Sequence, residues 1–128
     1  MLFLKSFLIL LLSFAIWTRH PEETPDPQTD NGFVIDAKVK PIIDAKCLGC
    51  HSADSKNDKA KEKLIWANLS TMDKKAAAST LDEVVEVIEK GEMPPAKFLE
   101  RYPDKKLTEK EAKSLRKWAD KSASKMLK

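Results

Sequence analysis

The feature that most constrains this chain is the pentapeptide Cys47-Leu48-Gly49-Cys50-His51, which contains both of its cysteines. The two thiols lie on one turn of backbone, and the histidine directly follows the second of them. Thiols at this spacing can each add to a vinyl group of one haem, and the adjoining imidazole then lies close enough to bind the iron. The pattern C-x-x-C-H therefore predicts one c-type haem, attached covalently through Cys47 and Cys50, with His51 as the proximal iron ligand.

Other interpretations of these residues explain less. A zinc site needs four ligands, and among cysteines and histidines only the distant His20 could complete the set. A thioredoxin-like C-x-x-C motif lies at the head of a helix in a strand-helix-strand unit, whereas no segment here has the pattern of a strand. A disulfide between the two cysteines would close a very small loop and leave His51 without a role.

The N-terminal segment predicts export. Lys5 precedes an apolar run from Phe7 to Trp17 that is interrupted only by Ser13. A basic start followed by a short apolar run is typical of a secretory signal, and this run is short for a membrane span. We expect residues 1–20 to be a signal peptide or, if uncleaved, a membrane tether, which places the rest of the chain in the periplasm or another exported location.

The next segment, residues 21–32, has the sequence PEETPDPQTDNG, which is polar and contains three prolines. This composition predicts a flexible linker, and residues 33–128 then form one small haem-c-binding domain. The chain is 34% charged with a net charge of +3, and its lysines alternate with carboxylates. Because no block is basic enough to bind nucleic acid, we expect no such partner, and membrane contact only through an uncleaved N-terminal segment.

Apolar spacing and capping signals predict an all-α domain. Pro41 suits the first turn of a helix that leads directly into the C-x-x-C-H pattern. Capping boxes that begin at Ser70, Thr80 and Thr108 each predict a helix start, and Gly91 predicts a helix end. We therefore expect helices over 40–47, from Ser70 to about 79, from Thr80 to Gly91 and from Thr108 to near the C-terminus, and a loop or short frayed helix over 52–63.

The second axial ligand of the iron is predicted to be Met93. Pro94 keeps Met93 out of the α-helical region, and Pro95 stiffens the segment as polyproline II, so the thioether can project into a cavity at low entropic cost. Met72, in the first turn of a predicted helix, is the runner-up. The remaining candidates are weaker, because they belong to the leader, the linker or the apolar stripe of the last helix: Met1, His20 and Met126.

Other side chains could approach the haem. Trp66 and Trp118 are large enough to pack near it, although plain core packing is the favoured interpretation of both. Tyr102 and Arg101 could donate to a haem propionate, or could equally be exposed at the surface.

A haem iron with both axial positions filled has no site for a substrate. We therefore expect an electron-transfer protein rather than an enzyme, with redox proteins as its unidentified electron donor and acceptor. The alternative is a haem-based peroxidase or gas sensor, in which peroxide or a diatomic gas displaces Met93 from the iron. A third possibility is a tethered partner subunit whose haem serves one dehydrogenase or oxidase.

From about Val34 to Lys121 the chain resembles the small bacterial cytochrome-c-type haem-binding domain family. The resemblance rests on the C-x-x-C-H-S sequence from Cys47 to Ser52, on Gly91-Glu92-Met93-Pro94-Pro95, and on weaker helical segments on either side of the latter. It implies a cytochrome-c-like helical fold around one covalent haem, with His51 and Met93 as axial ligands. The chain departs from many relatives over 53–59, where it lacks their tryptophan, tyrosine and proline.

Overall fold

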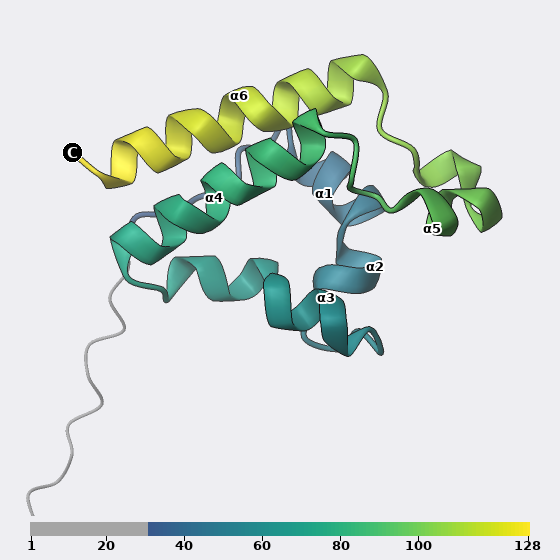
Figure 1. Ribbon diagram of the computed structural model, residues 1–128. Helices are drawn as coiled ribbons and strands as arrows, with labels where there is room; N and C mark the ends of the chain where they lie inside the picture. The colour runs from purple at the N-terminus through teal and green to yellow at the C-terminus, as the bar shows by residue number, and fades with distance from the viewer. Residues whose placement is uncertain (1–30) are drawn as a thin grey trace, which may run out of the picture.

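The computed structural model, shown in Figure 1, describes residues 31–128. The predicted leader over 1–20 and most of the predicted linker lie outside these residues. Within the described part the chain forms helices and no strand, so the predicted all-α class is confirmed. None of these helices is long and apolar enough to cross a membrane. With η marking 3-10 helices, the elements are α1 Lys40–Lys46, α2 Leu48–His51, α3 Asp58–Lys63, η1 Trp66–Ser70, α4 Lys74–Glu89, α5 Ala96–Arg101, η2 Pro103–Lys105 and α6 Glu109–Met126.

The two longest helices, α4 and α6, pack along each other in opposite directions (Figure 1). The predicted capping box starts α6. The Thr108 hydroxyl oxygen accepts from the Glu111 backbone N–H at 3.2 Å, and the Glu111 carboxylate accepts from the Thr108 N–H at 2.8 Å. Both bonds satisfy N–H groups that have no partner within the helix. The start of the last helix was therefore predicted correctly.

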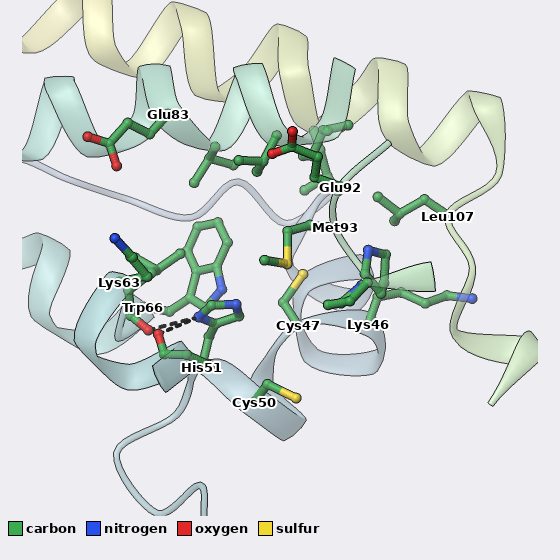
Figure 2. A pocket seen from close by; sticks show the side chains of 18 of the residues that line it. Lys46, Cys47, Cys50, His51, Lys63, Trp66, Glu83, Glu92, Met93 and Leu107 are labelled. Carbon is green, nitrogen blue, oxygen red and sulfur yellow. Dashed lines mark hydrogen bonds between the residues drawn. The ribbon is translucent and has the colours of Figure 1, made fainter. Parts of the chain in front are cut away.

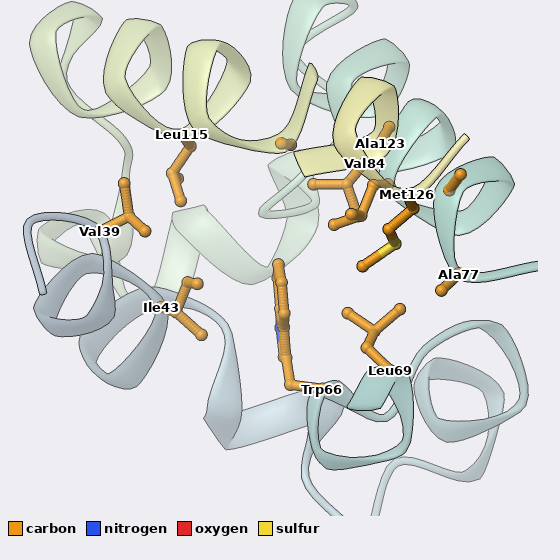
Figure 3. Packing of buried hydrophobic residues seen from close by; sticks show 12 residues of the cluster. Val39, Ile43, Trp66, Leu69, Ala77, Val84, Leu115, Ala123 and Met126 are labelled. Carbon is orange, nitrogen blue, oxygen red and sulfur yellow. The ribbon is translucent and has the colours of Figure 1, made fainter. Parts of the chain in front are cut away.

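The hydrophobic core lies between this helix pair and the segment formed by α1 and η1 (Figure 3). Its fully buried members include Leu81 of α4, Leu115 of α6, Ile43 of α1 and Leu69 of η1. Burial of each such side chain contributes about 1.5–3 kcal/mol to folding. The core thus fixes α1, which leads into the C-x-x-C-H pattern, relative to α4.

The helix α4 corrects the prediction of two helices over 70–90. It is one helix whose N-cap is Asp73, and the Asp73 carboxylate accepts from the N–H groups of Lys75 and Ala76 at 2.9 and 3.2 Å. The hydroxyl of Thr80 donates to the carbonyl oxygen of Ala76 at 3.0 Å, inside the helix, and does not cap a new one. Because Ser70 ends η1 instead, the predicted helix starts at Ser70 and Thr80 are both wrong.

Gly91 ends α4, as predicted. Its φ of +67° is accessible to glycine at little cost, and the two characteristic bonds of a Schellman motif are formed. The Gly91 N–H donates to Ile88 at 3.1 Å, and the Glu92 N–H donates to Val87 at 2.8 Å. The chain is thereby redirected, so that Met93 follows the helix in non-helical backbone.

Asn31 anchors the start of the described chain, although it belongs to the predicted linker. Only 6% of its surface is exposed. Its amide group donates to the carbonyl oxygens of Leu69 at 2.6 Å and Met72 at 2.9 Å, and its carbonyl oxygen accepts from the Phe33 N–H at 2.9 Å. The Phe33 ring then packs edge-on against Trp118 of α6, 5.8 Å between ring centroids.

Candidate haem-binding site

The C-x-x-C-H pattern forms the junction between α1 and α2. Pro41 lies in the first turn of α1, as predicted, and α1 ends at Lys46. Cys47 is both the C-cap of α1 and the N-cap of α2, which carries Cys50 and ends at His51. Both cysteines are half-buried free thiols, and they line the same cavity as His51 (Figure 2).

This cavity has a volume of about 670 Å³, which lies within the usual range of small-molecule and cofactor sites. One side is formed by α2, α3 and Trp66, and the other by α4 and the segment that carries Met93 (Figure 2). Its walls are mostly apolar, with contributions from Leu64, Val84, Val87, Ile88, Phe98 and Leu107. A cavity of this kind suits a large, mainly apolar group.

The imidazole of His51 is oriented by the end of α3. Its Nδ1 lies 3.1 Å from the carbonyl oxygen of Ala60 and 3.0 Å from that of Leu64. Carbonyl oxygens only accept hydrogen bonds, so Nδ1 carries the proton and Nε2 of the neutral ring keeps a free lone pair. A backbone carbonyl that holds Nδ1 in this way is typical of histidines that bind a metal through Nε2.

The position of α3 is itself fixed by side-chain capping. The Asn57 side-chain oxygen accepts from the Ala60 N–H at 3.1 Å. Ser55, which is buried, donates to the carbonyl oxygen of Gly49 at 3.1 Å and accepts from the Asn57 N–H at the same distance. These contacts tie α3 to the backbone of the C-x-x-C-H pattern, so segment 52–63 is a turn followed by the short capped helix α3, which positions His51.

The Cys47 thiol does not have the electrostatics of a reactive cysteine. Burial, and to a smaller extent the neighbouring Cys50, raises the pKa of the Cys47 thiol to about 11. Redox-active C-x-x-C pairs instead lower the pKa of one thiol.

Among residues 31–128, no group of three or more His, Cys, Asp or Glu side chains is arranged to hold a metal ion, and His20 lies outside these residues.

Met93 lies on the wall of the cavity that faces α2 (Figure 2). The Met93–Pro94 peptide bond is cis, and Pro95 has the φ of −60° and ψ of 140° of polyproline II. Met72 packs against the core, and Met126 is buried in α6. Of the methionines in the described part of the chain, Met93 is the one that lines the cavity, so the structure brings all four predicted site residues to one place.

The aromatic residues that the sequence analysis named differ in whether they line the cavity. Trp66 lines the cavity and is 4% exposed, and its ring lies 6.2 Å from that of Trp118. Tyr102 packs against Phe98 with a centroid distance of 4.9 Å and is 44% exposed. Neither Tyr102 nor Arg101 lines the cavity, which agrees with the surface alternative of the sequence analysis.

The lysines of the cavity wall were not identified from the sequence. Lys59 and Lys63 of α3 both contribute to the wall, together with Lys46 at the end of α1. The spacing of Lys59 and Lys63 could have indicated them, because residues four apart lie on the same face of a helix. That signal is usable only once 58–63 is known to be helical.

Residues 56–121 match the family described as haem-binding domain, and this match covers just over half of the 128-residue chain. The chain belongs to this haem-binding domain family. No curated protein and no solved structure matched the chain in the corresponding comparisons. The matched range begins after His51, so the family assignment and the C-x-x-C-H pattern are independent indications of haem.

The described residues fit a haem. The cavity supplies an apolar enclosure, the free Nε2 of His51 supplies a nitrogen ligand, and Cys47 and Cys50 supply two thiols beside it. Met93, on the opposite wall, supplies a thioether. Imidazole, thioether and thiol groups are donors that proteins use to hold haem.

Proposed function

We propose that this protein is an exported electron-transfer protein with a single c-type haem. The observation that carries the proposal is the meeting of Cys47, Cys50, His51 and Met93 on one largely apolar cavity. Membership of the haem-binding domain family, which rests on residues 56–121, supports the cofactor independently of Cys47, Cys50 and His51. The N-terminal apolar run supports export, which brings the chain to the compartment where c-type haem is attached.

Each site residue has a separate role in this proposal. Cys47 and Cys50 form thioether bonds, and His51 binds the iron through Nε2 while Ala60 and Leu64 hold its Nδ1–H. Met93 would supply its thioether sulfur as a further iron ligand. When bound, the haem supplies one-electron chemistry between ferrous and ferric iron. The apolar wall keeps water from the site, and methionine ligation in such surroundings raises the reduction potential.

The proposal includes no catalytic residue and no substrate. His51 is the only histidine within residues 31–128, and here it is a ligand, so no general base of that type remains. Electrons are exchanged with a donor protein and an acceptor protein. The lysines and carboxylates that alternate along α3 give no basic block, so the partners need not be strongly acidic.

One observation favours a second candidate function. Met93 lies on a short loop between α4 and α5 and does not belong to the hydrophobic core. If the thioether leaves the iron easily, a diatomic gas or hydrogen peroxide can bind there. The protein would then be a gas sensor or a haem peroxidase.

The rate of carbon monoxide binding distinguishes between these two functions. We expect the purified protein to show one reversible one-electron transition in an optical redox titration, because one iron changes state. We expect the ferrous form to bind carbon monoxide only slowly, because Met93 must first dissociate. Rapid carbon monoxide binding by the unmodified protein would contradict electron transfer and favour the sensor or peroxidase.

A further inference from the structure

The segment that carries Met93 forms a separate lobe of the domain. This distal lobe, residues 93–107, contains the Met93 loop, α5 and η2, and Figure 1 shows α5 at one end of the molecule beside α1 and α2. Within the lobe, α5 packs mainly on η2. The lobe contributes Met93, Phe98 and Leu107 to the cavity wall, so its position relative to α2 sets the width of the cavity.

Two lysines connect this lobe to α1. The Lys46 ammonium group donates to the carbonyl oxygen of Asp104 and, at 3.1 Å, to that of Lys106. The Lys105 ammonium group donates in the opposite direction, to the carbonyl oxygen of Ala45 at 3.1 Å. Ala45 belongs to the last turn of α1, where carbonyl groups lack partners within the helix. We refer to these three bonds as the lysine clip.

The lysine clip is the main polar connection of the distal lobe. Among residues 31–128, the hydrogen bonds that join 93–107 to elements outside this stretch are the three bonds of the clip. Other bonds of the lobe, such as those from Phe98 to Pro95 and from Lys106 to Pro103, are internal. At its far end, half-buried Leu107 packs against the core.

The clip also joins the two sides of the candidate haem site. Lys46 and Ala45 immediately precede Cys47, the first thioether residue of the proposal, and Lys46 itself lines the cavity. Asp104 and Lys106 follow Met93 on the same lobe. A loss of the clip would therefore release the lobe with Met93 while leaving Cys47, Cys50 and His51 in place.

We propose that the lysine clip holds the distal lobe against α1 and thereby keeps the Met93 sulfur at the haem iron. The inference rests on the proposed function, because it takes Met93 as the axial ligand. Lys46 and Lys105 are positioning residues that act through Met93 and do not touch the iron. Since a bond from a charged donor stabilises a structure more than a neutral one, their removal should shift the lobe measurably towards an open state.

The test uses the full-length haem protein with Lys46→Met, which keeps the aliphatic stem and removes the donor. We expect the ferrous variant to bind carbon monoxide roughly tenfold faster than the unmodified protein. The far-red band of methionine-ligated ferric haem should weaken, whereas the mass of the covalent haem adduct should not change. Lys105→Met should act in the same direction, and Lys46→Arg, which keeps charged donors, should restore slow binding.

The matched control is Lys40→Met, which removes the same charge from the same helix. Lys40 pairs with Asp44 at 2.6 Å and does not contact the lobe, so carbon monoxide binding should match that of the unmodified protein. If Lys46→Met and Lys105→Met behave like Lys40→Met while Met93→Ala binds rapidly, the clip is refuted and Met93 ligation stands. If Met93→Ala is also without effect, the proposed ligation itself fails.

Discussion

Replacement of Met93 by alanine is expected to abolish the weak far-red band of the ferric protein and to make carbon monoxide binding to the ferrous protein fast. Alanine has no donor atom, so water or an added ligand takes the sixth position of the iron. The reduction potential should fall, because the thioether favours the ferrous state. Covalent haem should be retained, since Cys47, Cys50 and His51 are unchanged, and stability should drop only modestly because Met93 lies outside the hydrophobic core.

Met72→Ala is the control for this prediction. Met72 packs against the core and does not line the cavity. Its variant should lose some stability and keep both the far-red band and slow carbon monoxide binding. If Met72→Ala removes the band and Met93→Ala retains it, the ligand assignment is wrong.

Replacement of both cysteines by serine should have the largest effect on the cofactor. Serine is similar in size but forms no thioether, so any haem in the Cys47→Ser, Cys50→Ser protein should pass into the organic phase on acid extraction. Without the haem, the walls of a cavity of about 670 Å³ lose their contacts, and helix content and thermal stability should fall. Circular dichroism and haem content of the purified protein measure both effects.

The two single variants provide the matched comparison. Cys47→Ser and Cys50→Ser should each retain haem through the one remaining thioether, whereas the double variant should not. A double variant that still holds haem after acid extraction would show that neither cysteine is the attachment point. A single variant that loses all haem would show that one thioether alone is insufficient.

The elements that the sequence predicted well are those with a local signal at each end. The Thr108 capping box and the apolar stripe through Leu115 and Ala119 define α6, and Gly91 marks the end of α4. The start of α4 was missed because Ser70, Asp73 and Thr80 are all competent caps. Burial of Ala77, Ala78, Leu81 and Val84 on one stripe favours the single long helix, and that packing is not visible in the sequence.

The site residues likewise fall into two groups: those marked by a short sequence motif, and those that depend on contacts between distant parts of the chain. Cys47, Cys50 and His51 form one short motif, and Met93 is marked by its prolines, so all four could be proposed from the sequence. The carbonyl groups of Ala60 and Leu64 that orient His51 could not, because backbone acceptors carry no residue signature. The lysine clip could not be predicted either, because its partners, such as Lys46 and Lys106, are 60 positions apart in the sequence.

The most direct test of covalent haem attachment is acid–organic extraction of the purified wild-type protein, followed by intact mass measurement of the polypeptide. We predict that the colour stays with the polypeptide, and that its mass exceeds that of the chain by one haem. The double serine variant gives the reference for haem that is not covalently held. Haem in the organic phase, or a polypeptide mass without it, would contradict the assignment of Cys47 and Cys50 as the attachment site.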